Sequence, residues 1–239
     1  MRPQIDTHTH TLLSGHAHST LLENAAAAAD FGLKGFVLTD HGPMLPGASP
    51  EFVLSTYKFF PAEIHDVRVY HGVEANIFND EGSIDIQDKY LKMLDYVIAG
   101  LHEFVRLSGG RTKDTETVLR ALSNPHIDII SHPDNPAYDL DYEAIVKETA
   151  RLNKLMEVND HSFLFRKGGA ENALKYLELC KRYGVRVAVS SDAHFALEMG
   201  KHTTALKVLE LAEFPSELVV SLTRERFDAY LDERKRRLV

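Results

Sequence analysis

The segment Ile5-Asp6-Thr7-His8-Thr9-His10 has the pattern of a short strand that ends in metal-binding side chains. Residues two apart in a strand point to the same face, so His8 and His10 can bind one cation together. Neutral imidazole is among the commonest metal ligands in proteins. His16 follows in a Gly-containing loop that can fold back over the same strand end. A lone His-x-His pair is more often a surface pair, so the metal interpretation depends on the rest of the chain.

Strand and helix patterns alternate along the rest of the sequence. The expected strands after the first are 35–41, 67–74, 96–102, 127–133, 155–159 and 185–194. The expected helices are 20–31, 52–66, 84–94, 114–122, 141–153, 171–183, 204–212 and 224–236. Polar residues end the seven strands at intervals of about 30 residues, which is the length of one βα unit.

This repeat predicts an α/β fold with a parallel sheet, and seven units indicate a closed or nearly closed barrel. The pattern shows no linker, so we expect one domain, residues 1–239. Barrel enzymes place their active sites at the C-terminal ends of the strands. Every expected strand except the sixth delivers His, Asp or Glu to that end. A doubly wound open sheet is the alternative, but it would gather ligands at a single switch point.

Nine residues are candidate metal ligands. They are His8, His10, His16, His41, Glu74, His102, His132, Asp192 and His194. Many imidazoles with two carboxylates suit Zn²⁺, Mn²⁺ or Fe²⁺, and suit Mg²⁺ or Ca²⁺ poorly. Nine ligands exceed what one ion takes, so we expect two to three ions per chain. Carboxylates bridge metals more readily than imidazoles do, which makes Glu74 the expected bridge.

Taken together, several short motifs resemble the PHP (polymerase and histidinol phosphatase) family. They are His-x-His after the first strand and the segments 39–42, 72–76, 100–103, 131–133 and 191–194. The chain is most similar to the stand-alone YcdX-type phosphatases of that family. That likeness depends on the segments 16–20, 135–136 and 166–168.

The resemblance implies a distorted (β/α)7 barrel with a trinuclear metal centre at the C-terminal ends of the strands. It assigns His8, His10, Glu74 and Asp192 to the first metal. It assigns Glu74, His102 and His132 to the second, and His16, His41 and His194 to the third. Glu74, Asp192 and His194 are then the expected catalytic residues.

A metal-activated hydroxide at such a centre would cleave small phosphate monoesters. Arg166 and Lys167 follow the sixth strand and are the expected substrate-binding residues, because they offer a guanidinium and an ammonium to the phosphate. Asp40, Glu157 and Asn159 are expected to orient ligands or face substrate. The alternatives are a nuclease of the same family and a non-catalytic metal-binding module.

The composition limits the partners. The net charge of −8 disfavours nucleic acid as a partner, and a small phosphorylated substrate is expected instead.

The single cysteine, Cys180, lies in an apolar helical run and is expected to be buried. No run of 18 apolar residues predicts a membrane span, and the N-terminus lacks the apolar region of a signal peptide, so we expect a cytoplasmic protein. The oligomeric state stays open, a homo-oligomer included.

Overall fold

Seven parallel strands form the centre of the computed structural model, which describes residues 1–238. In spatial order they are β1 (Ile5–Thr9), β2 (Gly35–Leu38), β4 (Val67–Asn76), β5 (Tyr96–Gly100), β6 (Ile129–Ile130), β7 (Leu155–Asn159) and β8 (Val187–Ser190). The first and last strands also meet, because Thr9 bridges Ala193 and the His10 N–H donates to the Ala193 carbonyl at 2.9 Å. The sheet is therefore nearly closed into a barrel, as the βα repeat predicted.

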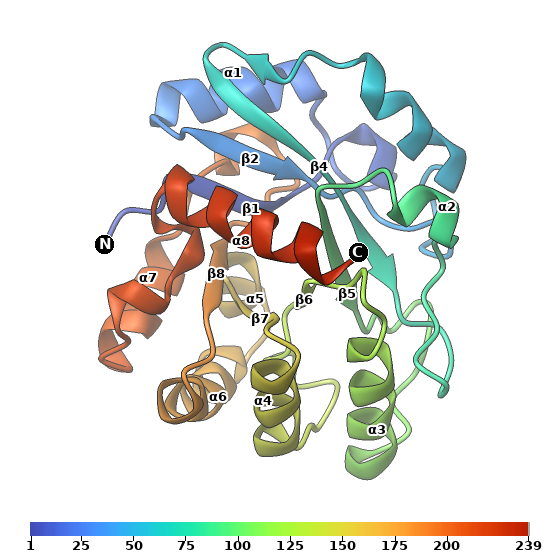
Figure 1. Cartoon of the computed structure of the whole chain (residues 1–239), viewed down its shortest axis with the longest axis vertical. Coiled ribbons are helices and arrows are strands. Elements are labelled where there is room, and N and C mark those ends of the chain that lie inside the picture. The colour runs from blue at the N-terminus through green and yellow to red at the C-terminus, as the bar shows by residue number, and fades with distance from the viewer. Residues whose placement is uncertain (239) are drawn as a thin grey trace.

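The helices surround this barrel, with α1 outside β2 and with α3, α4 and α6 along the opposite side (Figure 1). They are α1 (Leu21–Phe31), α2 (Asp88–Leu91), α3 (Arg111–Leu122), α4 (Tyr142–Arg151), α5 (Asp160–Phe165), α6 (Gly169–Tyr183), α7 (Thr203–Leu211) and α8 (Arg224–Arg237). The short 3₁₀ helices are η1 (Leu12–Ser14), η2 (Glu51–Phe59), η3 (Ala196–Glu198), η4 (Ser216–Leu218) and η5 (Val220–Leu222). Within residues 1–238, no helix combines the length and the apolar character needed to span a bilayer.

The helix ends follow from local sequence. Thr20 caps α1 by accepting the Glu23 N–H, and the Glu23 carboxylate accepts the Thr20 N–H at 2.7 Å, which together form a capping box. Gly32 ends α1 with a left-handed φ of 86°. The Asp141 side chain caps α4 by accepting the Ala144 N–H.

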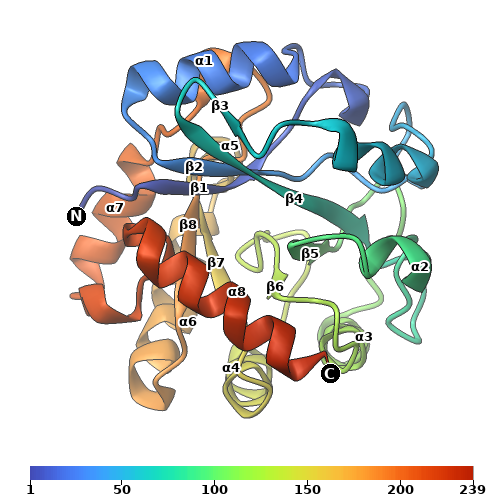
Figure 2. The ribbon, with the colours of Figure 1, turned by 45° about the horizontal axis from the view of Figure 1, so that its top comes forward.

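Helix α8 closes the N-terminal end of the barrel (Figure 2). Its Phe227 and Tyr230 pack with Ile5 and other buried side chains at the starts of the strands. Its buried Arg234 donates to Asp128, which lies just before β6, at 2.7 Å. Because α8 packs across this end, an open site can form only at the opposite end, where the strands finish.

The expected helix 52–66 is wrong in its second half. Residues Glu51–Phe59 form η2, but Glu63–Ile64 form a short strand, β3, that pairs antiparallel with the start of β4. Phe60 is extended because it precedes Pro61, and a residue before proline avoids the helical region. His65 and Asp66 both have positive φ, 53° and 60°, as a tight hairpin turn of the primed type requires.

Several other elements are also shorter than expected, and three of them have a clear local cause. Of the expected helix 84–94 only α2 forms, because Ile84 bridges Ile77 and the Asp85 carboxylate accepts backbone N–H groups of Met44 and Asn76. The expected strands 127–133 and 185–194 shrink to β6 and β8. They stop early because His132 and Asp192 adopt left-handed backbone conformations that a strand cannot contain.

Lys154, which precedes β7, gives a test of this packing. Its side chain is 2% exposed and donates to the carbonyl of Asn124 at 2.6 Å and to that of Leu122. Burial, together with the charge of Arg237, lowers the pKa of Lys154 to about 7. Between this value and the ordinary pKa near 10.5, the unfolded chain binds more protons, so stability rises with pH in that window.

We predict that raising the pH from 7 to 9.5 stabilises the wild type by about 1–3 kcal/mol relative to Lys154→Met, which lacks the titrating ammonium. Urea unfolding of both proteins at the two pH values measures this difference. Equal pH dependence of the two free energies of unfolding would contradict a depressed pKa at Lys154.

Candidate metal centre

The nine predicted ligands all lie at the C-terminal ends of the strands. His8 and Glu74 are within β1 and β4, and the other seven lie in the connections that follow strands. His132 and Asp192 take φ values of 30° and 56°. Such values are uncommon for residues other than glycine and mark positions that the surrounding structure holds in place, often at functional sites.

Glu74 lies at the centre of the group, 1% exposed. Its Oε1 is 3.2 Å from His102 Nε2 and 3.1 Å from His132 Nε2. Its Oε2 is 3.1 Å from His8 Nε2 and 2.8 Å from His41 Nδ1. The two carboxylate oxygens thus face two different sets of imidazoles, which is the arrangement that a bridging ligand requires.

The remaining four residues complete the cluster. Asp192 Oδ1 is 3.0 Å from His10 Nε2 and 3.5 Å from His8 Nε2. His194 Nε2 is 2.9 Å from His16 Nε2. The loop that carries His16 can approach because its neighbour Gly15 has φ 81° and because a side chain there would collide with the backbone of Gly47.

Hydrogen bonds to the outer ring nitrogens determine where the protons sit. His16 Nδ1 faces the Ser14 carbonyl at 3.1 Å, and His194 Nδ1 faces the Asp192 carbonyl at 2.8 Å. Carbonyls only accept, so each Nδ1 carries its ring's proton. The two Nε2 lone pairs of His16 and His194 then face each other at 2.9 Å. That contact is repulsive between neutral rings and favourable when both nitrogens bind one cation.

A cation suits the interior of the cluster as well. His8 Nε2 and His41 Nδ1 are buried without a hydrogen-bond partner, although each lies close to Glu74 Oε2. Among residues 1–238, no Lys or Arg forms an ion pair with Glu74 or Asp192. Three triads have ligand atoms close enough to share an ion: His8–His10–Glu74, His41–Glu74–His102 and His10–His41–His194. The donor set therefore fits the transition-metal ions expected from the sequence.

Ser14 and Asp40 hold His10. The Ser14 hydroxyl donates to Asp40 at 2.6 Å, so it accepts from His10 Nδ1 at 3.0 Å. Asp40 also accepts the Thr11 N–H at 2.7 Å. Asp40 was expected to orient a ligand imidazole, and it acts on His10 through the Ser14 hydroxyl. His10 consequently presents an unprotonated Nε2 to the cluster.

Asn76 and Asp85 hold His102 in the same way. The Asn76 side-chain amide donates to Asp85 at 2.6 Å and to the Gly42 carbonyl at 3.1 Å. The amide oxygen of Asn76 therefore faces His102 Nδ1 and accepts its proton at 2.7 Å. The Nε2 of His102 is left free to face Glu74.

Glu157, on the sixth parallel strand β7, contacts two candidate ligands. Its Oε1 accepts from His8 Nδ1 at 2.7 Å, and its Oε2 accepts the backbone N–H of His132. Ser190 also donates to Oε1 at 2.7 Å. The sequence placed no candidate metal ligand at the end of this strand, but Glu157 was expected to orient ligands or face substrate, and these hydrogen bonds fit the orienting role. Partners of this kind fix ring orientation and tune the metal.

Burial and charge set the ionisation of the cluster. Burial opposes a charge on His8, but Glu74, Asp192 and Glu157 outweigh it and raise the pKa of His8 well above its usual value. Burial and the neighbouring His194 lower the pKa of His10 well below the usual value. Burial lowers the pKa of His41 to about 4, although the charge of the nearby Glu74 acts to raise it. Most rings are therefore neutral and ready to bind a cation, whereas the carboxylates around His8 attract positive charge.

A pocket of about 690 Å³ opens above the cluster. The half-buried Arg166 lines it, just past the end of α5, and its Nη1 is buried without a hydrogen-bond partner. Lys167 is exposed and lies outside the lining. His18 and His161 do line the pocket, and the His161 ring lies 5.4 Å from that of His194.

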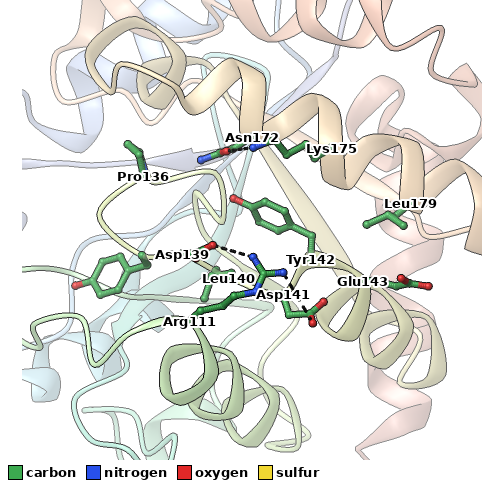
Figure 3. Close-up of a pocket in the computed structure, with 11 residues that line it drawn as sticks. Arg111, Pro136, Asp139, Leu140, Asp141, Tyr142, Glu143, Asn172, Lys175 and Leu179 are labelled. Carbon is green, nitrogen blue, oxygen red and sulfur yellow. Dashed lines mark hydrogen bonds and ion pairs between the residues drawn. The ribbon is translucent and has the colours of Figure 1, made fainter.

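A second hollow, of about 560 Å³, lies between α4, α6 and the loop before α4 (Figure 3). Its Arg111 pairs with Asp139 at 3.0 Å and with Asp141 at 4.0 Å. Its Lys175 donates to Asn172 at 2.9 Å. Arg111 is already paired with carboxylates and Lys175 already donates to a neighbouring amide, so this hollow offers less to a phosphate than the pocket above the cluster does.

Three residues outside the cluster are also buried or packed. Cys180 is fully buried, as expected. The His71 ring packs against Tyr57, with ring centroids 5.5 Å apart. His202, the N-cap residue of α7, is buried and lies 3.5 Å from Asp6.

The roles of Ser14 and Asp85 were missed. Neither residue stands in a periodic pattern, and each acts only through a neighbour brought close by the fold. The one available signal was the position of Ser14 in the same short loop as His16.

The profile of the PHP domain matches residues 6–161, and the chain belongs to this family. A probable phosphatase from Acetivibrio thermocellus is 39% identical over 238 residues, covering 100% of this chain and 99% of that protein. Another, from Caldicellulosiruptor saccharolyticus, is 41% identical over 228 residues, with 95% of each chain covered. A phosphatase-type hydrolase is the class that these relatives support.

The fold is also that of a solved histidinol phosphate phosphatase from Lactococcus lactis. The two share a TM-score of 0.59 at 16% identity, over 90% of this chain and 95% of that one. That structure contains Zn, L-histidinol and phosphate. A chain in an archaeal ribonuclease P structure has the same TM-score at 15% identity, over 96% of this chain and 91% of that one. At these identities the likeness concerns the barrel alone.

The hydrogen bonds of Glu157 generate a prediction. Glu157→Gln keeps the size of the side chain but points an N–H₂ group at partners that are themselves donors. We expect it to weaken metal binding by roughly 10–100-fold, as loss of a ligand's supporting partner does. Titration against a competing chelator measures the affinity, with Glu210→Gln on the exposed side of α7 as the control. Equal affinities in the three proteins would refute the role of Glu157.

The depressed pKa values generate a second prediction. Burial lowers the pKa of His10, His41, His132 and His16, so these rings stay neutral below the usual value of 6.5. His8 shifts the other way, but a cation bound at the same carboxylates replaces its proton. We therefore expect bound metal to be retained at pH 6 and released as the pH falls toward about 4. Equilibrium dialysis across this range tests the expectation, and half-release at or above pH 6.5 would contradict it.

Proposed function

We propose that this protein is a metal-dependent hydrolase of small phosphate monoesters. The observation that carries the proposal is the buried carboxylate of Glu74, whose two oxygens face separate sets of imidazoles at the bottom of an open pocket. The relatives named as probable phosphatases support the reaction class. The solved structure with zinc and phosphate supports the type of ion and ligand.

In this proposal the nine residues hold two to three ions of Zn²⁺ or Mn²⁺, with Fe²⁺ as a further candidate. Bound ions of this kind supply Lewis acidity, which activates water and polarises phosphoryl oxygens. Glu74 belongs to two sets of ligands, one with His8, His10 and Asp192, and the other with His102 and His132. His16, His41 and His194 form the third set. Asp192 and His194, which line the pocket, are the proposed catalytic residues beside Glu74.

Arg166 is the proposed phosphate-binding residue. Its guanidinium has a buried Nη1 that makes no hydrogen bond within the described chain, and it lines the same pocket as His132 and His194. A planar guanidinium can donate two parallel hydrogen bonds to a phosphate. Arg106, another cation near the cluster, is already paired with Asp114 at 2.7 Å and with Asp80 at 2.9 Å.

The direct test is hydrolysis of a panel of phosphate monoesters beside single-stranded DNA and RNA, with purified and metal-reconstituted protein. We expect metal-dependent release of phosphate from monoesters and little cleavage of the nucleic acids, whose polyanionic backbones a net charge of −8 repels. Faster cleavage of nucleic acid than of monoesters, or full activity after chelation, would overturn the proposal.

For Arg166→Ala we predict a fall in kcat/KM of roughly tenfold or more, because a charge-assisted hydrogen bond contributes about 1.5–3 kcal/mol. Inorganic phosphate should also inhibit this variant more weakly than it inhibits the wild type. Metal content should stay unchanged, which separates substrate binding from metal ligation.

Lys167→Ala is the matched control, because Lys167 is the neighbouring cation but lies outside the pocket lining. We expect near wild-type kinetics from it. Unchanged kinetics and phosphate inhibition in Arg166→Ala, or an equal loss in both variants, would remove Arg166 from the site.

A further inference from the structure

We propose that the preferred substrates are monophosphates whose organic group is apolar and carries no second negative charge. This inference deepens the proposed function and rests on it. It concerns the mouth of the pocket above the cluster rather than the cluster itself, and it depends on two independent features of that mouth: its apolar wall and its distribution of charge.

Apolar side chains form the wall between the cluster and solvent. Leu45 and Leu101 line the pocket and are buried. Phe104 and Phe195 stand at its mouth, 83% and 45% exposed. Large apolar side chains left exposed beside a concave site are typical of surfaces that bind apolar groups.

The chain places both aromatic residues next to candidate metal ligands. Phe104 lies two residues after His102 in the loop that follows β5, and Phe195 directly follows His194 beyond β8. The same two loops therefore carry cluster imidazoles and mouth phenylalanines. A small phosphate monoester with its phosphate at the cluster would have its organic group within reach of these rings.

The charge at the mouth favours a single phosphate. Arg166 is the one Lys or Arg side chain among the residues described as lining this pocket, and Glu103 and Glu198 also line it. Glu198 keeps its position by accepting the His194 N–H at 3.0 Å. A first phosphate can use Arg166 and the cluster, whereas a second phosphate at the mouth would meet two carboxylates. Like charges in a partly desolvated cleft repel more strongly than they do in bulk water.

Matched substrates test the apolar wall. Hexyl phosphate and glycerol phosphate both release a primary alkoxide, so their intrinsic reactivities are similar and their kcat/KM values differ mainly through contacts with the organic group. We expect hexyl phosphate to be favoured by about tenfold, as burial of a few methylene groups predicts. The measurements use metal-reconstituted full-length protein.

Substitutions of the two mouth phenylalanines test whether they cause the preference for hexyl phosphate. Phe104→Ala and Phe195→Ala should each raise KM for hexyl phosphate several-fold and leave glycerol phosphate unchanged. Phe59→Ala is the control, because Phe59 is 75% exposed on η2 and lies outside this pocket. It should behave as the wild type with both substrates.

Hexanediol bisphosphate tests the charge at the mouth, because it adds a second phosphate to the same apolar chain. We expect the wild type to prefer hexyl phosphate over it. Glu103→Lys should lower the ratio of kcat/KM for hexyl phosphate to kcat/KM for the bisphosphate several-fold. Glu210→Lys on α7, which changes the net charge equally, should leave this ratio unchanged.

The outcomes separate this inference from the proposed function. Equal kcat/KM for hexyl and glycerol phosphate, or an equal loss on both in the phenylalanine variants, would overturn the substrate preference and leave a monoester phosphatase standing. A wild type that prefers the bisphosphate would also overturn the substrate preference and leave the proposed function standing. Failure to hydrolyse any monoester after metal reconstitution would overturn both proposals.

Discussion

The structure of this site depends on one buried carboxylate. Glu74 projects from β4 into a ring of imidazoles, and none of the Lys or Arg residues in the described chain pairs with it. Removing an ion from water costs several kcal/mol unless its charge is balanced nearby. Protonated His8 can balance this charge, and so can metal ions that use the same nitrogen and oxygen atoms. The proposed metal centre therefore follows from the charge that the fold buries.

The barrel supplies two further conditions. Helix α8 packs across the N-terminal end with the Arg234–Asp128 pair, so an open site can form only at the opposite end. At that end, hydrogen bonds that the imidazoles donate to Glu157, Asn76 and Ser14 fix the ring positions. They hold protons on the outer nitrogens of the candidate ligands and leave the inner nitrogens free. Electrostatic preorganisation of this kind needs no rearrangement when a ligand arrives.

The sequence predicted the cluster well because polar residues at the ends of parallel strands converge whatever the lengths of the connecting helices. It predicted less where a feature depends on contacts distant in the chain. Asp85 acts through Asn76, and no local pattern marks it. Arg166 and Lys167 were both expected to bind substrate, but the end of α5 leaves the first lining the pocket and the second exposed outside it. The expected helix 52–66 ends early because the residue before Pro61 is extended and because His65–Asp66 form a turn.

Anomalous scattering from crystals of zinc-reconstituted protein tests the central claim most directly. If Glu74 bridges, the anomalous map should contain peaks on both sides of its carboxylate, one toward His102 and His132 and the other toward His8 and His10. Crystals of Glu74→Gln should lose or weaken both peaks together. A single peak that leaves one carboxylate oxygen without an ion, or two peaks that persist unchanged in Glu74→Gln, would contradict the account.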